Sequence, residues 1–310
     1  MTLRQLRYIC EIAKHSLNIS AAAETLHTNQ SGLSKQVKLL EEELGVVIFS
    51  RSKSRLIDIT PQGQVILARA RVIVSEALSI KAACQEFSIS KKEPLVVAVT
   101  HTQARYFVPK VIEAFRTQYP TTPISMLDAA PAQVIDLVMS GEASVGLAVF
   151  NPLPRRDLVV LPCRGFDKVV VVPLDHPLLK LQRIELSDLV QYPLVMQQPT
   201  STTGRQIMGT FEQNGYAPNI VLHATDSDVI KNYVTLRVGI AILSSNSFEE
   251  KIDTKLKAIP AGHLFGPSIT NLFLSRHRYL QRSVFDFIEL CAPEWTRNRV
   301  QLRLSSDAEE

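Results

Sequence analysis

Polar and basic side chains gather between residues 18 and 60 at a spacing typical of DNA recognition. A helix predicted to start at Thr28 or Asn29 carries one polar face, formed by Gln30, Ser31, Ser34, Lys35 and Lys38. Amide, hydroxyl and ammonium groups can bond base edges in the major groove and phosphate oxygens. A hairpin then carries Arg51, Lys53 and Arg55, whose cations can lie against the sugar-phosphate backbone. The expected chemistry is recognition of double-stranded DNA.

The elements that position these groups follow from hydrophobic spacing and from residues that begin and end helices. A first helix is predicted over residues 20–26, with Ser20 as its N-cap, and its alanines allow close packing of the next helix. The second helix has an apolar stripe at helical spacing, formed by Leu33, Val37, Leu40 and Leu44, and ends at Gly45. Strands at 46–49 and 56–59 complete a winged helix-turn-helix, in which Ser20, Thr28 and Asn29 also belong to the DNA-contacting surface. The alternative is a small three-helix core with a solvated charged surface.

Composition places the basic charge in the N-terminal part of the chain. The chain has 310 residues, 45% of them hydrophobic, which is enough for two or three domains. Residues 1–92 hold 13 Lys and Arg against 8 Asp and Glu, whereas residues 93–310 hold 21 against 22. We therefore expect only the N-terminal module to meet a polyanion.

Targeting and cysteine patterns point to a cytoplasmic protein with no membrane partner. The N-terminus has no apolar stretch typical of a signal peptide, and no run reaches the length of a membrane span. Cys10, Cys84, Cys163 and Cys291 are scattered without C-x-x-C spacing, which disfavours a zinc site and a disulfide framework. We expect free thiols in a reducing compartment.

A long helix is predicted after the hairpin, with Thr60 as cap and Pro61 in the first turn. Apolar residues recur every seven positions, at Ile66, Ile73, Ile80 and Phe87. A small residue lies four positions after each of the first three, at Ala70, Ala77 and Cys84. This pattern predicts a coiled-coil seam that joins two copies of the chain. The alternative is a helix packed on its own domain. We assign residues 1–60 to the DNA-binding domain and 61–90 to the linker helix and hinge.

Beyond residue 91 strands and helices alternate, which predicts an α/β effector domain of two lobes. Strands are expected at 95–99, 123–127, 145–149, 168–173, 194–196, 220–223, 240–243 and 271–274, and helices at 104–119, 132–140, 203–214, 227–236 and 280–291. That rhythm is typical of parallel sheets covered by helices. Lobe I is expected to cover about 93–162 and 268–295, and lobe II about 163–267.

Hydroxyl-rich turns follow a predicted strand in each lobe, where open α/β sheets bind ligands. Thr100, Thr102 and Gln103 lie in the first turn, and Thr202 and Thr203 in the second. Such groups suit a small oxyanion or carboxylate, although threonine is also a common helix cap. No nucleophile, metal or phosphate-loop motif accompanies His101, and Asp226 fits better as a cap, so we expect no enzymatic activity and no cofactor.

The chain resembles the LysR-type transcriptional regulators, within them the CysB/Cbl-like subgroup, over about residues 1–295. The matching segments are LRYI (6–9), SKQV (34–37), THTQARY (100–106), TGR (203–205) and TDSDVIK (225–231). The resemblance implies a homotetramer acting on promoter DNA with RNA polymerase as a partner. It also implies a winged helix-turn-helix, a linker helix and a periplasmic-binding-protein-like effector domain.

The resemblance further implies an effector related to sulfur assimilation, such as sulfate, thiosulfate or acetylserine, held by Thr100, Thr102, Gln103, Thr202 and Thr203. Val149 and Phe150 stand where relatives tend to place a hydroxyl and then an acid, and the turn at 198–203 has one extra residue. Val149 is thus expected on a less polar wall of the site. The alternative is a regulator of the same fold that senses an unrelated small carboxylate or organosulfur compound.

Overall fold

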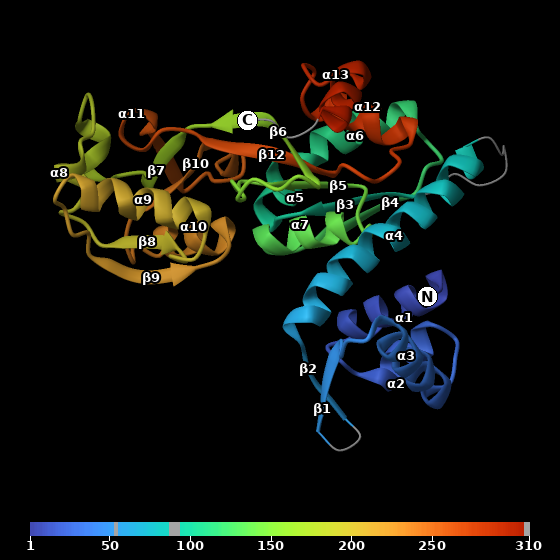
Figure 1. Ribbon diagram of the computed structural model, residues 1–310. Coiled ribbons are helices and arrows are strands. Elements are labelled where there is room, and N and C mark those ends of the chain that lie inside the picture. The colour runs from blue at the N-terminus through green and yellow to red at the C-terminus, as the bar shows by residue number, and fades with distance from the viewer. Residues whose placement is uncertain (53–54, 87–93, 307–310) are drawn as a thin grey trace. The chain divides into compact units, whose positions relative to one another are not determined.

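The computed structural model describes residues 1–52, 55–86 and 94–306 (Figure 1). They form two compact units. One contains the N-terminal residues together with Met139–Glu142 and Ser275–Gln281, and the other contains the rest of the chain. Among the described residues, no helix is both long enough and apolar enough to cross a membrane.

The N-terminal unit is a helical core with a two-stranded wing. Ile9, Ile12, Leu33, Leu40 and Phe49 are fully buried in its centre. The wing strands pair antiparallel. The elements are α1 (Leu3–Lys14), α2 (Ile19–Thr25), α3 (Gln30–Leu44), β1 (Phe49–Ser52), β2 (Arg55–Ile59) and α4 (Pro61–Glu86).

The helix-turn-helix forms as predicted, with a different cap on its first helix. Asn18, not Ser20, caps α2, because its side-chain oxygen accepts a hydrogen bond from the Ala21 amide at 3.1 Å. Ser20 lies two residues after Asn18, inside the helix, and so cannot be its N-cap. Asn29 caps α3, so Thr28 lies outside that helix, and Gly45 ends it in the left-handed conformation at φ 69°.

The first wing strand begins three residues later than predicted, and the buried stripe of α3 is shorter than predicted. β1 begins at Phe49 rather than at Val46, because the Val46 amide donates to the Glu41 carbonyl and so completes the end of α3. Leu33, Val37 and Leu40 are buried, but Leu44 is exposed in the last turn, beyond the core.

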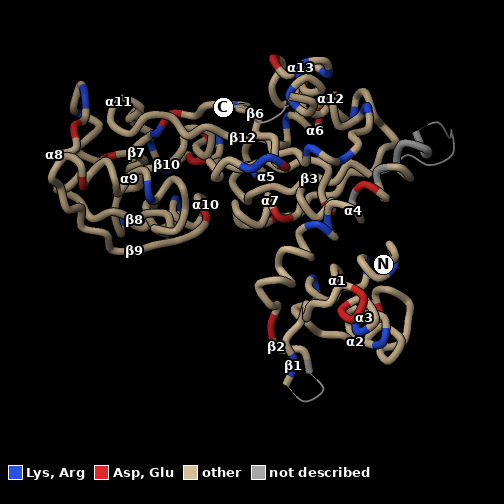
Figure 2. Tube along the Cα trace, viewed as in Figure 1, with Lys and Arg blue, Asp and Glu red and all other residues tan. Residues whose placement is uncertain are grey.

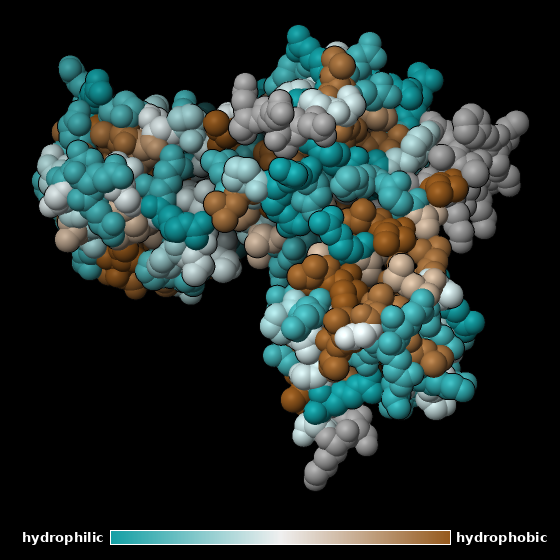
Figure 3. All heavy atoms as spheres, in the orientation of Figure 1, coloured by the Kyte–Doolittle hydropathy of each residue, from teal (hydrophilic) through white to brown (hydrophobic). Residues whose placement is uncertain are grey.

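The linker helix α4 begins as predicted, since the Thr60 hydroxyl accepts from the Gly63 amide at 2.9 Å. Its 26 residues give a length of about 39 Å. Leu67 and Ala70 are buried and α4 contacts α1, so the start of the helix packs on its own unit, as the alternative interpretation held. Ile73 and Ile80 of the seven-residue pattern are exposed, and Figure 3 shows apolar surface on this unit. Phe87 lies outside the described residues.

Lobe I of the second unit is a mixed sheet with helices around it. The strand order is β4-β3-β5-β12-β6, in which β3 pairs parallel with β4 and β5, and β12 pairs antiparallel with β5. The strands are β3 (Leu95–Val99), β4 (Ile124–Asp128), β5 (Val145–Ala148), β6 (Leu158–Phe166) and β12 (Ser268–Ser275). The helices are α5 (His101–Tyr106), α6 (Val108–Gln118), α7 (Pro131–Met139), α12 (Arg282–Cys291) and α13 (Arg297–Ser305).

The prediction of a single helix at 104–119 was wrong. The chain forms α5 and α6, separated at Phe107. Pro109 lies in the first turn of α6, and a proline there has no amide to donate and disfavours continuation of the preceding helix. The break leaves α5 as a short separate helix directly after β3.

Lobe II is not the purely parallel sheet that the alternation predicted. Its central strand β7 pairs antiparallel with β10 and β11, whereas β8 pairs in parallel with β9 and forms one isolated parallel bridge, from Leu194 to Ile240. The sequence analysis predicted neither β11 nor β6 of lobe I. The strands are β7 (Lys168–Pro173), β8 (Leu194–Gln197), β9 (Ile220–Ala224), β10 (Ala241–Ser244) and β11 (Leu256–Pro260). The helices are η1 (Pro177–Lys180), α8 (Leu186–Leu189), α9 (Thr202–Gln213), α10 (Ser227–Thr235), η2 (Ser245–Ser247) and α11 (Gly262–Phe265).

The chain passes between the lobes twice, after β6 and before β12. The ammonium group of Lys168, which is fully buried at the first crossing, donates to the hydroxyl of Ser268 at the second. Burial lowers the pKa of Lys168 to about 8, and the charge of Asp167 opposes that shift. A polar bond therefore ties the two crossings together.

Gly63 allows α4 to approach the segment before the wing. A Cβ at this position would overlap the carbonyl oxygen of Ile48 and lie 2.9 Å from its carbonyl carbon. We predict that Gly63→Ala lowers the free energy of unfolding by about 1–3 kcal/mol, because the backbone must shift. Gly209→Ala is the control. Its Cβ would meet no atom within 4 Å, and a helical alanine stabilises by about 0.5–1 kcal/mol. Urea denaturation that gives equal stabilities for both variants would contradict this packing.

Candidate DNA interface and inter-lobe site

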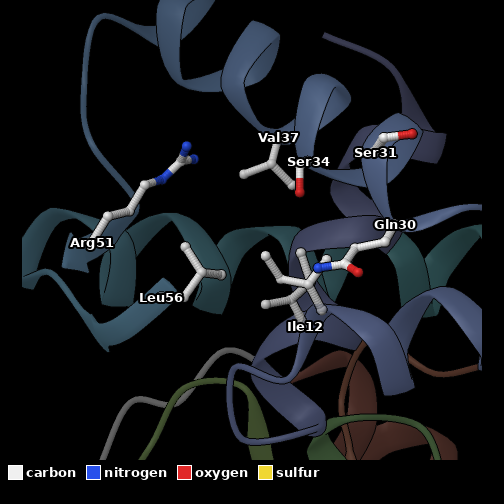
Figure 4. Close-up of a pocket in the computed structure, with 8 residues that line it drawn as sticks. Ile12, Gln30, Ser31, Ser34, Val37, Arg51 and Leu56 are labelled. Carbon is white, nitrogen blue, oxygen red and sulfur yellow. The ribbon is translucent and has the colours of Figure 1, made fainter. Parts of the chain in front are cut away.

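A hollow of about 620 Å³ lies between the N-terminal part of α3 and the wing (Figure 4). Its floor is apolar and its rim is polar. Arg51 stands on one side, and Gln30 and Ser31 stand on the other. The lining residues are Ile12, Ile19, Gln30, Ser31, Ser34, Val37, Arg51 and Leu56. Four of the residues predicted to contact DNA therefore surround one concave surface.

The other predicted DNA-contacting residues on the helices lie around this hollow or are used locally. Ser20 is exposed on α2, and its hydroxyl donates to Gln30 Oε1 at 3.2 Å. Asn29 uses its side-chain oxygen to cap α3, and Thr28 is half-buried in the turn. Lys35 and Lys38 are exposed, and Lys38 Nζ lies 3.6 Å from Glu42 Oε1. Lys35 has the greater freedom to reach a phosphate.

Basic residues of the wing differ in their surroundings. Arg51 on β1 pairs with Glu41, with 2.7 Å between Nη2 and Oε2. Lys53 lies outside the described residues, and the backbone of Arg55 begins β2. Figure 2 shows basic residues on β1 and α3, while the acidic residues of α3 fall in its C-terminal part. The N-terminal end of α3 is therefore the less acidic end, as contact with DNA requires.

Glu41 links α3 to the wing, a structural role that the sequence analysis missed. Its Oε1 accepts hydrogen bonds from the amides of Ile48 and Phe49, at 2.8 and 3.1 Å, while Oε2 holds Arg51. The side chain is only 10% exposed. One carboxylate thus joins the recognition helix to the first wing strand. Glu41 is the first of three consecutive glutamates, and nothing in the sequence distinguishes it from Glu42 and Glu43.

We predict that Glu41→Gln weakens DNA binding several-fold and lowers the free energy of unfolding by about 1–2 kcal/mol, because charge-assisted bonds to the wing are lost. Glu42→Gln removes the same charge from an exposed side chain. It should leave stability within about 0.5 kcal/mol and slightly strengthen DNA binding, since a negative charge near phosphates is removed. Equal DNA affinities for the two variants would exclude a positioning role for Glu41.

The predicted effector residues of lobe I lie on or beside α5. Thr100 occupies the N-cap position of α5 without a side-chain capping bond, so the capping alternative does not apply to its hydroxyl. Thr102 is half-buried, and Gln103 is 2% exposed with its Oε1 unpaired among the described residues. Val149 is half-buried just after β5.

In lobe II the predicted residues begin α9. Ser201 caps this helix, accepting from the Gly204 amide at 2.9 Å. Thr202 is therefore free of the capping role, and its buried hydroxyl has no partner in the described part of the chain. Thr203 is half-buried beside it. Gly204 is required here, because a Cβ would overlap the backbone carbonyl oxygen of Gln198 and lie 2.9 Å from the hydroxyl oxygen of Ser201.

Charged residues join the two lobes between α5 and α10. His101 Nε2 lies 2.7 Å from Asp226 Oδ2, and its Nδ1 lies 3.2 Å from Asp128 Oδ2. Asp226 also caps α10, as predicted, through bonds from the amides of Asp228 and Val229. The Arg105 guanidinium pairs with Asp228, and the Tyr106 hydroxyl donates to Asp228 Oδ1 at 2.5 Å. The sequence analysis named His101 and Asp226 and quoted the segments that contain Arg105, Tyr106 and Asp228, but it missed Asp128 and could not pair any of these residues.

A buried lysine completes this network. Lys231 Nζ lies 3.0 Å from Asp228 Oδ1 and 3.0 Å from Asp253 Oδ2. The same nitrogen is 5.3 Å from the centre of the Tyr106 ring. Burial alone would raise the pKa of Asp228, but bonds from Tyr106, Lys231 and Arg105 outweigh it and lower that pKa. Burial, then the bond to Asp228, raises the pKa of Tyr106 well above its usual value. Asp228 thus stays ionised and holds groups of both lobes.

Among the described residues, no group of three or more His, Cys, Asp or Glu side chains is placed to hold a metal ion. Cys10, Cys163 and Cys291 are free thiols there. Burial raises the pKa of Cys10 to about 11 and of Cys163 to about 12.

Comparison with known families assigns both parts of the chain. Residues 3–64 match the bacterial regulatory helix-turn-helix of the LysR family, and residues 90–296 match the LysR substrate binding domain. The chain belongs to the LysR family. It is therefore a DNA-binding transcriptional regulator with a helix-turn-helix and a two-lobed domain.

Individual relatives match over almost the whole length. This LysR-family chain is 40% identical over 301 residues to the HTH-type transcriptional regulator CysB of Haemophilus influenzae, covering 97% of the chain and 93% of that protein. It is 37% identical over 309 residues to CysB of Burkholderia cenocepacia, covering 100% and 99%. The crystal structure of the cofactor-binding domain of the Cbl regulator matches at a TM-score of 0.66 and 32% identity, covering 70% of this chain and 96% of that one.

Proposed function

We propose that the chain binds promoter DNA through the hollow between α3 and the wing and controls transcription of genes of sulfur metabolism. The observation that carries the DNA part is the concave surface on which Gln30, Ser34 and Arg51 meet. Its polar rim can bond base edges and phosphates, while its apolar floor suits thymine methyl groups. The similarity to CysB proteins supports the sulfur connection.

The effector in this proposal is a small anionic metabolite bound between the lobes. Sulfate, thiosulfate and acetylserine are the candidates, and Thr100, Thr102, Gln103, Thr202 and Thr203 are the proposed contacts. Hydroxyls not used for capping in both lobes support this placement. An unrelated small carboxylate is the alternative. A ligand controls DNA binding only through different affinities for two arrangements of the protein.

The active assembly in this proposal is a homotetramer that works with RNA polymerase. Exposed apolar side chains on α4 support pairing through this helix, since a second copy would remove them from water. They are Val65, Ile73, Leu78 and Ile80.

We predict that Lys35→Ala weakens binding to every DNA sequence and reduces the slope of log affinity against log salt by about 1, because one phosphate contact is lost. Lys257→Ala is the control, since Lys257 is an exposed lysine of lobe II. Fluorescence anisotropy with a labelled duplex at several salt concentrations measures both slopes. If Lys35→Ala and wild type share one slope, α3 does not meet the phosphates.

We also predict that Thr102→Ala weakens effector binding about tenfold or more without unfolding the protein, because the hydroxyl proposed to donate a hydrogen bond to the anion is removed. Thr117→Ala on α6 is the control, since that hydroxyl bonds only its own helix, at the Glu113 carbonyl. Calorimetric titration with sulfate, thiosulfate and acetylserine measures the affinities. Equal affinities for both variants would remove Thr102 from the site.

A further inference from the structure

A side-chain hydrogen bond joins the two helices of the helix-turn-helix beside the hollow. Ser20, the second residue of α2, donates from its hydroxyl to Oε1 of Gln30, the first residue of α3, at 3.2 Å. Both residues are exposed, and a hydrogen bond in water adds little to folding stability because water replaces either partner. The bond therefore acts mainly on the direction of the Gln30 side chain.

Ser20 is itself held in place by its helix. The Asn18 side chain caps α2 through the Ala21 amide, and Ala22 and Ala23 are buried in the core of the N-terminal unit. α2 also contacts α3 directly. The hydroxyl of Ser20 therefore has a set position relative to the start of α3, and it holds one end of the Gln30 amide there.

Gln30 differs from its neighbours at the start of α3 in having polar groups that are not used locally. Asn29 Oδ1 accepts from the Gly32 amide at 2.6 Å and from the Ser31 hydroxyl at 3.1 Å, so the side chains of Asn29 and Ser31 bond each other and the helix start. Gln30 Nε2 makes no hydrogen bond within the described residues, and the side chain lies at the rim of the hollow (Figure 4). Its amide thus offers a free N–H group beside a carbonyl oxygen that keeps one unused lone pair.

An oriented amide selects one base by its chemistry. In the major groove adenine presents an acceptor, N7, beside a donor, the N6 amino group, whereas guanine presents two acceptors. Cytosine offers an amino donor, and thymine offers a carbonyl acceptor with a methyl group. A freely rotating amide can turn its NH2 group to guanine or its oxygen to cytosine, but a restrained amide presents donor and acceptor together. Because a hydroxyl also accepts, this pairing of groups persists whichever way the amide is turned.

We propose that Ser20 is a positioning residue that holds the Gln30 amide for bidentate reading of adenine in one A·T base pair. This inference rests on the proposed function, because it assigns base chemistry to the same DNA surface. Ser20 acts through Gln30 rather than through a phosphate contact of its own. Ordering the long Gln30 side chain before binding also lowers the conformational entropy that is lost when DNA binds.

Base-pair substitutions in a duplex that the full chain selects from a random library test the assignment. We expect one A·T pair whose discrimination, about five- to hundredfold in wild type, is lost in Gln30→Ala. Ser20→Ala should reduce discrimination at that same pair about three- to tenfold, whereas Ser20→Thr, which keeps the hydroxyl, should retain it. The double variant should equal Gln30→Ala alone, because both changes remove one contact. Replacing that adenine by 7-deazaadenine, which lacks the N7 acceptor, should weaken wild type and leave Gln30→Ala unaffected.

Thr25→Ala is the matched control on α2. The Thr25 hydroxyl bonds the Ala21 carbonyl of its own helix and His15 rather than α3, so its loss should leave discrimination at every base pair as in wild type. Thermal unfolding verifies that each variant is folded.

The possible failures are distinguishable. If Ser20→Ala keeps wild-type discrimination at the pair that depends on Gln30, or weakens all duplexes equally, Ser20 does not position Gln30. If Gln30→Ala loses discrimination at no pair or at a pair other than A·T, or if 7-deazaadenine leaves wild-type binding unchanged, the adenine reading is wrong. If wild type selects no shared sequence, the proposed DNA recognition fails together with this inference.

Discussion

The carboxylate of Glu41 sets the distance between the recognition helix and the wing. It accepts two backbone amides at the start of β1 and the guanidinium of Arg51, so one nearly buried charge fixes three groups. In the proposed function, base contacts from α3 and phosphate contacts from the wing are made together, which requires that fixed distance. Glu41 thus joins α3 to β1, the two elements that carry Gln30 and Arg51 on opposite sides of the hollow.

The two lobes of the second unit are held together in a comparable way, by the contacts of Asp228 with Arg105 and Tyr106. Removing one partner from a buried ion pair leaves an uncompensated charge, which is strongly destabilising. Lys231 is satisfied by Asp228, Asp253 and the Ser247 carbonyl at once. The network therefore favours one arrangement of the lobes, and an effector must bind that arrangement differently from its alternatives to change DNA binding.

Much of this fold could be predicted from the sequence, because local signals determine it. Asn29, Gly45, Thr60 and Asp226 begin or end helices as expected, since capping depends on neighbouring residues alone. Ser20 failed as a cap because Asn18, two residues earlier, offers the same chemistry. The break at Phe107 was signalled by Pro109 and was overlooked.

The rest could not be predicted, because it depends on residues far apart in the chain. Arg105 and Asp228 are separated by 123 positions, and no periodicity indicates that they meet. β11 was missed because its sequence, LKAIP, has no run of β-branched or aromatic residues, and its pairing with β7 becomes visible only in the structure. The buried hydroxyl of Thr202, which has no partner among the described residues, likewise becomes visible only when the surrounding side chains are in place.

Selection of duplexes from a random DNA library by the full chain tests the central claim most directly. The account predicts that recovered duplexes share a sequence, and that Ser34→Ala relaxes the preference at some positions of it, because a side chain facing the bases has been removed. Recovery of unrelated sequences by wild type, or an unchanged preference in Ser34→Ala, would contradict the assignment of this surface.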